Sequence, residues 1–272
     1  MQNLFSSILM VFILSWGLNA QAGRFCNSVS QQLEFCQKMK HLATAVNALD
    51  SQNILMRTDP LYMNALAGSV YNTATRLIDV VPGALQTHKQ PLFEIQRVAR
   101  DLGQQSRDNN WAMLETVNLV GQKCMNCHTS SSPQNGMGWN EMFGYGWSTI
   151  VQECSKPGHN PYMCKTMNAI GANYNHIVSA SVAKIENHTV TYALAREIQR
   201  LIQDLASRGF QHMRPELVKK ANLDAMEVMQ LAQQQSSQTF VKARNLNNTC
   251  MECHNSVNPQ STNSQRRALV SW

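Results

Sequence analysis

Hydrophobic residues recur at helical spacing along most of the chain. The clearest series is separated by four, three, four and three residues: Met163, Met167, Ile170, Tyr174 and Ile177. This spacing places side chains on one face of an α-helix. Residues 39–49 show nearly the same pattern, and no segment alternates convincingly as a β-strand does. The pattern therefore predicts an all-α fold.

Proline and glycine residues indicate where the predicted helices begin and end. Asp59 and Pro60 form an N-cap followed by a proline at the first helical position, and Pro82-Gly83 ends this helix near Val81. The other starts are predicted near Pro91, Asn110, Asn160, Thr189, Pro215 and Ser237. Helices of about 15 to 20 residues joined by short loops predict antiparallel four-helix bundles.

A five-residue motif occurs twice, at residues 124–128 and 250–254, and both copies read Cys-x-x-Cys-His. This is the attachment pattern of c-type haem: the two thiols reach both vinyl groups of one porphyrin, and the histidine is the proximal iron ligand. A zinc site or a redox dithiol explains the two cysteines but not the histidine that follows them in both copies. The sequence therefore predicts two haem c groups. Their predicted attachment residues are Cys124, Cys127, Cys250 and Cys253, and their proximal ligands are His128 and His254.

The motifs belong to a longer internal repeat. A shift of 126 residues maps the first motif onto the second and Pro133-Gln134 onto Pro259-Gln260. A shift of 128 maps the pair Cys26/Cys36 onto Cys154/Cys164, and His88 with Pro91 has its counterpart in His212 with Pro215. These markers indicate a duplicated unit of about 125 residues. We expect one four-helix bundle in residues 23–134, a linker in 135–150 and a second bundle with a short tail in 151–272.

Four cysteines remain outside the two motifs, and four cysteines allow three disulfide connectivities. The identical spacing within each unit favours Cys26–Cys36 and Cys154–Cys164. Such bonds persist in an oxidising compartment.

The first 22 residues carry no charge and contain an apolar run from Leu4 to Leu18, followed by Ala20-Gln21-Ala22. This pattern predicts a signal peptide that is cleaved after Ala22, although the missing positive charge leaves an uncleaved anchor as the alternative. No later stretch is long and apolar enough to span a bilayer. The net charge is +6, and the absence of a dense Lys/Arg block argues against nucleic-acid binding. We expect an exported, periplasmic protein.

A four-helix bundle that ends in Cys-x-x-Cys-His resembles the cytochrome c-prime family, the class II cytochromes c, twice over. The resemblance implies that each haem lies inside its bundle and that the sixth iron position is either open or filled by a methionine from the first helix. Met39 and Met167 match that position, although core packing is their alternative role. His88 and His212 are rival ligands in predicted loops. The extra cysteine pairs depart from the family pattern, and Lys38 and Lys165 match its basic residue only loosely.

These features predict a periplasmic dihaem electron-transfer protein, not an enzyme, that exchanges electrons with redox partner proteins. The alternative is a protein that binds nitric oxide or carbon monoxide at an open haem. A dihaem peroxidase is less favoured because the sequence shows no distal acid–base constellation. We also expect a monomer whose two units act as an internal pseudo-dimer.

Overall fold

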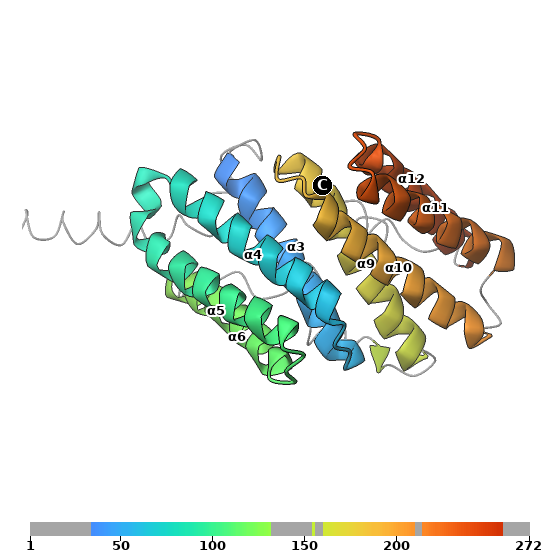
Figure 1. Cartoon of the computed structure of the whole chain (residues 1–272), viewed down its shortest axis with the longest axis horizontal. Helices are drawn as coiled ribbons and strands as arrows, with labels where there is room; N and C mark the ends of the chain where they lie inside the picture. Colours follow the sequence, from blue (N-terminus) through green and yellow to red (C-terminus); the bar gives the residue numbers. More distant parts are fainter. Residues whose placement is uncertain (1–33, 132–153, 156–159, 210–213, 258–272) are drawn as a thin grey trace, which may run out of the picture.

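The computed structural model describes residues 34–131, 154–155, 160–209 and 214–257. Over these residues the chain forms eight α-helices and one short 3-10 helix and no strand, which confirms the predicted all-α fold (Figure 1). The elements are α3 (Glu34–Leu55), α4 (Pro60–Val80), η1 (Gly83–His88), α5 (Lys89–Arg107), α6 (Met113–Ser131), α9 (Pro161–Val182), α10 (His188–Ser207), α11 (Pro215–Gln233) and α12 (Thr239–Val257).

Side-chain caps explain where three of these helices begin. Asp59 accepts hydrogen bonds from the backbone N–H groups of Leu61 and Tyr62 and so caps α4. The side chain of Asn160 accepts a hydrogen bond from the backbone N–H of the third residue of α9, and that of Asn187 accepts one from the third residue of α10. Each cap pairs a backbone donor that the first helical turn leaves without a partner. The predicted starts at Pro60 and Pro161 are therefore confirmed.

The helix boundaries repeat along the chain. A shift of 128 residues maps α3 onto α9 and α4 onto α10 to within one residue, and a shift of 126 maps α5 onto α11 and α6 onto α12. Two pairs of non-glycine residues with positive φ also match under these shifts: Met56 with Lys184, and Asn109 with Gln235. Because this conformation is uncommon for such residues, its recurrence at matched turns shows that the second half repeats the local backbone of the first.

Two predicted boundaries are shifted in the structure. The third helix begins at Lys89 rather than Pro91, because η1 leads directly into it. The fourth helices begin at Met113 and Thr239, a few residues later than predicted. Asn110 and Ser236 first form turns, in which each side chain accepts a hydrogen bond from the backbone N–H two residues later. Both fourth helices continue past the cysteine motif, so each motif lies inside a helix.

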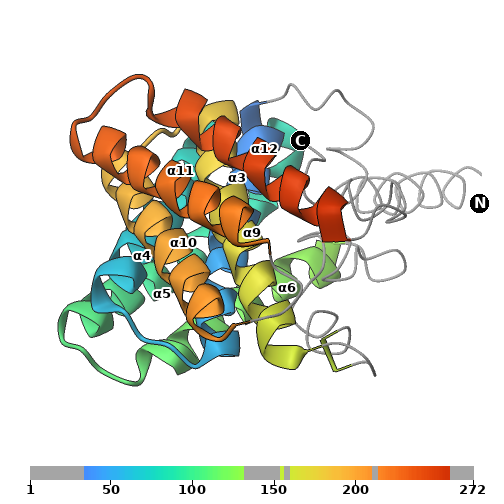
Figure 2. The same cartoon turned by 90° about the vertical axis from the view of Figure 1, so that its right-hand side faces the viewer.

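The helices pack in two sets that meet at the centre of the molecule. In the N-terminal half, α3 to α6, consecutive helices contact each other and α6 returns to α3. The C-terminal half, α9 to α12, has the same contacts, and α3–α9 and α4–α10 join the halves. Figures 1 and 2 show these four helices between α5 and α6 on one side and α11 and α12 on the other. Because α3 contacts three helices, even its polar residues are buried.

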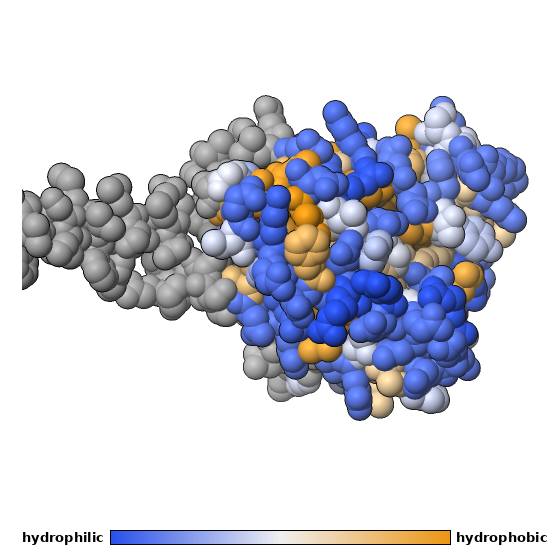
Figure 3. Space-filling view, turned by 60° about the vertical axis from the view of Figure 1, so that its left-hand side comes forward, coloured by the Kyte–Doolittle hydropathy of each residue, from blue (hydrophilic) through white to orange (hydrophobic). Residues whose placement is uncertain are grey.

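Apolar side chains form the interior of both halves. The largest fully buried ones include Leu49, Tyr62, Met63 and Leu66 of the N-terminal half and Ile177, Leu194, Ile198 and Leu201 of the C-terminal half. On the face shown in Figure 3, hydrophilic residues predominate and hydrophobic ones form small separate patches. Within the described ranges, no helix combines the length and the apolar character needed to cross a membrane.

The predicted Cys154–Cys164 disulfide is present. In the chain-entropy model, a bond that closes a loop of this size contributes about 3 kcal/mol to stability. Cys36 also takes part in a disulfide, but its predicted partner, Cys26, lies outside the described residues. The predicted signal peptide in residues 1–22 and linker in residues 135–150 lie outside them as well.

Candidate functional site

The two Cys-x-x-Cys-His motifs lie in the last three turns of α6 and α12. On a continuous helix, positions i, i+3 and i+4 share one face, so the backbone places Cys124, Cys127 and His128 together. The matched helix does the same for residues 250, 253 and 254. The imidazole groups of the two histidines lie outside the described part of the structure. The helix geometry therefore groups the positions that haem attachment needs.

All four motif cysteines carry thiols rather than disulfides. Burial raises the pKa of Cys124 and Cys250 to about 12 and that of Cys127 to about 11, and it raises the pKa of Cys253 as well. Such thiols stay protonated at neutral pH, whereas zinc ligands and redox dithiols act as thiolates. Among the described residues, no group of three or more His, Cys, Asp or Glu side chains could hold a metal ion.

A side-chain contact sets the register of α3 against α6. The amide of Asn53 donates to Asn118 Oδ1 at 2.9 Å. The thiol of Cys124 interacts electrostatically with Asp50, which lies earlier on α3, so the two helices run antiparallel. At 1.5 Å per residue, the backbone of His128 lies level with about residue 43, and Met39 lies about one turn further along.

Met39 also lies on the correct side of its helix. It precedes Val46 and Asn53 by seven and fourteen residues, and a spacing of seven keeps side chains on nearly the same face. In the C-terminal half, Tyr174 interacts electrostatically with Cys250, and Met167 precedes Tyr174 by seven residues. Both methionines are half-buried against the core. The structure thus places each methionine on the face of its helix that meets the Cys-x-x-Cys-His motif, and haem binding and iron ligation by these thioethers stay predictions.

The side chain of the rival ligand His88 contacts the backbone of its own turn. Its Nδ1 lies 3.2 Å from the carbonyl oxygen of Leu85, within η1. This contact fits the role of a turn residue. His212 lies outside the described residues.

A cavity of about 400 Å³ lies between α10 and α11. Its lining includes Leu205, Pro215 and Val218. The charges of Arg214 and Glu216 act on Cys253, so the start of α11 lies beside the C-terminal motif and the cavity lies at the level of that motif. This volume is in the range of small-molecule pockets.

The matched region of the N-terminal half is packed differently. Leu92, the counterpart of Val218, is 3% exposed. The amide of Gln96, the counterpart of Asn222, donates to Thr75 Oγ1 at 2.7 Å. In the C-terminal half the side-chain oxygen of Asn222 is buried without a hydrogen-bond partner. The two halves therefore differ in the space that they leave at the level of the motifs.

Sequence reasoning missed a buried polar network between α3 and α9. The rings of His41 and His176 stack with centroids 4.4 Å apart, and both side chains are fully buried. Three contacts surround them: His41 Nδ1 to Ser179 Oγ at 2.7 Å, His176 Nδ1 to Thr44 Oγ1 at 3.0 Å, and His176 Nε2 to Ser69 Oγ at 2.9 Å.

Burial favours neutral imidazoles. The hydroxyl groups of Thr44 and Ser179 lie 2.8 Å apart and also contact the backbone carbonyls of His41 and His176, so the polar groups form one connected network. Desolvation by burial lowers the pKa of His41 to about 3 and holds that of His176 well below its usual value. Both histidines are therefore uncharged at neutral pH.

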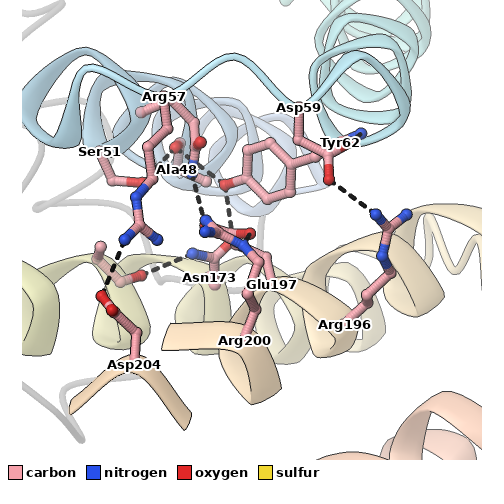
Figure 4. Close-up of polar contacts among 12 residues, drawn as sticks. Ala48, Ser51, Arg57, Asp59, Tyr62, Asn173, Arg196, Glu197, Arg200 and Asp204 are labelled. Atoms are coloured by element: carbon pink, nitrogen blue, oxygen red, sulfur yellow. Dashed lines mark hydrogen bonds and ion pairs between the residues drawn. The ribbon is translucent and has the colours of Figure 1, made fainter. Parts of the chain in front are cut away.

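A second group of polar contacts continues along the same interface (Figure 4). Tyr62 donates to Asn173 Oδ1 at 2.6 Å, and Arg57 binds Asp204 at 2.9 Å. Two further contacts cross the interface, Arg196 to Asp59 at 2.9 Å and Gln52 to Glu197 at 3.1 Å. Within α10, Glu197 is also ion-paired with Arg200. Because buried polar groups are costly when unpaired, these contacts fix how the two halves meet.

One sequence signal could have indicated this interface. Under the shift of 128 residues, His41 corresponds to Ala169 and His176 to Ala48. When one unit has a large polar residue where the other unit has alanine, on the apolar side of the same helix, the polar residue indicates a contact that the other unit does not make. Asp50, which is 9% exposed and corresponds to Val178, carries the same signal.

Comparison of the whole chain with known proteins adds no family to this picture. No protein-family model matches the sequence, and neither the curated proteins nor the solved structures give a match.

Proposed function

We propose that the chain is a periplasmic dihaem c-type cytochrome that transfers electrons between redox partner proteins. In this proposal, each half is an antiparallel four-helix bundle of the cytochrome c-prime type that carries one haem c on its fourth helix. The two halves form an internal pseudo-dimer within a monomer.

One observation carries the proposal. The same Cys-x-x-Cys-His motif lies at the same position of two helices, α6 and α12, whose first and last residues coincide under the shift of 126. A chance motif has no reason to keep its place in a repeated fold. The histidine directly after the second cysteine in both copies and the methionine on the facing helix suit a haem better than they suit zinc.

The residues of the chain have separate roles in this function. The cysteine thiols would hold the haem through thioether bonds, and His128 and His254 would bind iron from the proximal side. Met39 and Met167 would supply soft axial ligands that raise the reduction potential. A bound haem would supply a one-electron couple.

Gas binding is the second candidate, because a cavity of about 400 Å³ lies between α10 and α11 in the half that carries the C-terminal motif. An open sixth position there would bind nitric oxide or carbon monoxide. The matched region of the N-terminal half is filled, so this candidate applies to the C-terminal haem.

A spectroelectrochemical titration tests the proposal. We expect two reversible one-electron transitions and low-spin ferric spectra at both haems, because a thioether at the sixth position gives a strong ligand field. High-spin ferric spectra at both haems would contradict electron transfer through two six-coordinate sites and favour gas binding.

A further inference from the structure

A buried carboxyl group distinguishes the N-terminal haem site from the C-terminal one. Asp50 lies on the face of α3 that meets α6, one turn after Val46, and it is 9% exposed. Its charge acts on the thiol of Cys124. The Asn53–Asn118 contact places Asp50 opposite Gly121, which has no side chain and lies one turn before Cys124 on α6. Asp50 therefore lies beside the attachment residue of the N-terminal haem.

The C-terminal half has no equivalent charge at this position. The residue that corresponds to Asp50 is Val178, which is half-buried and packs against the core. The charge that acts on Cys250 comes instead from Asp224 of α11, which is half-buried and accepts a hydrogen bond from Thr249. The two attachment sites therefore differ in the helix that supplies the carboxyl group and in how deeply that group is buried.

The other titratable groups facing this part of α3 are a thiol, a phenol, an imidazole and a paired carboxylate. Cys124, from α6, loses its ionisable proton on thioether formation. Burial raises the pKa of Tyr62, from α4, well above 10 and lowers that of His176, from α9, well below 6.5. Glu197, from α10, is ion-paired with an arginine of its own helix. Burial raises the pKa of Asp50 to about 7, and no charged group among the described residues contributes to that shift.

We propose that Asp50 takes up a proton from solvent when the N-terminal haem is reduced near neutral pH, and that it thereby makes the reduction potential of this haem depend on pH. The inference rests on the proposed function. A carboxylate beside the attachment residue stabilises the more positive, ferric state of the haem. When a one-electron redox protein delivers an electron, the Asp50 carboxylate takes up one proton from water and becomes a neutral carboxylic acid.

The proposal fixes the sign of the pH dependence. At low pH the carboxyl group is protonated in both oxidation states, and at high pH it is ionised in both. Between these limits reduction requires a proton, so the potential of the N-terminal haem falls as the pH rises. A tenfold change in proton concentration shifts a one-electron couple by at most 59 mV. The potential of the C-terminal haem lacks this contribution.

The test is a redox titration of the full-length haem protein at a series of pH values near neutrality. Asp50→Asn keeps the shape of the side chain but cannot ionise. Above the titration range, we expect this variant to raise the potential of one of the two transitions and to remove its pH slope. Asp101→Asn, which removes an exposed carboxylate from α5 of the same half, is the matched control and should leave both transitions unchanged.

The outcomes separate this proposal from the function on which it rests. Absence of haem from the purified protein contradicts the proposed function. Two haems with an unchanged slope in Asp50→Asn contradict the role of Asp50 alone. Redox-difference infrared spectra of the unmodified protein provide a second measurement: reduction should produce a carboxylic acid C=O band that Asp50→Asn lacks. An unmodified protein without this band also refutes the proposal.

Discussion

Replacing His41 by asparagine is expected to make the stability of the protein less sensitive to acid, by about 3 kcal/mol between pH 7 and pH 4. The pKa of His41 is about 3 in the folded chain because the ring is buried, against an ordinary value of 6.5. The unfolded chain therefore binds a proton that the folded chain does not. This contribution to stability is complete above pH 6.5 and is lost as the pH falls towards 3. Removal of the imidazole removes this loss.

Denaturant unfolding at several pH values measures the effect. Asp50 acts in the opposite sense, because its raised pKa makes its burial less costly as the pH falls, but this contribution is common to both proteins and cancels in the difference. Asparagine keeps a polar atom near the position of Nδ1, so part of the contact with Ser179 survives. His88→Asn, in the η1 turn, is the control and should retain the full acid sensitivity. An unchanged pH dependence in His41→Asn would show that the buried pair is not neutral in the folded state.

Replacing Met167 by alanine is expected to open the C-terminal haem to external ligands. If the thioether occupies the sixth position, carbon monoxide must displace it, so binding to the reduced protein is slow or incomplete. The variant should make one of the two haems high-spin, lower its potential and increase its rate of carbon monoxide binding on the order of tenfold or more. The other haem should keep its low-spin spectrum. Stopped-flow mixing with carbon monoxide measures the rate.

Met229→Ala is the matched control, because this methionine also packs partly buried against the core but lies on α11. It should leave both haems six-coordinate. Should the unmodified protein already bind carbon monoxide stoichiometrically and be high-spin at both sites, Met39 and Met167 are core residues and gas binding is the better function. One open and one closed site would assign gas binding to one half and electron transfer to the other.

The sequence predicted the features that depend on local chemistry. Helix starts at Pro60 and Pro161 follow from their capping residues, and the Cys154–Cys164 bond follows from a short, repeated spacing. The four motif cysteines were also recognisable from spacing alone. The structure adds the facing surfaces of α3 and α6, which support but do not test the assignment of Met39.

The features that the sequence did not predict depend on how distant helices meet. His41 and His176 are far apart in the chain, and the stacking of their rings depends on the packing of α3 against α9. The burial of Asp50 arises because α3 is surrounded by three helices. Helical periodicity reports which face of one helix is apolar, but it does not report which two faces pack together.

The most direct measurement of the central claim is the mass of the intact, denatured protein. Two haem c groups attached through Cys124, Cys127, Cys250 and Cys253 predict a mass gain of two haems and haem colour that persists on a denaturing gel. Replacement of both Cys250 and Cys253 by alanine should leave the mass gain of one haem. The protein must be produced in a host that matures c-type cytochromes. If it then carries one haem or none, the central claim is contradicted.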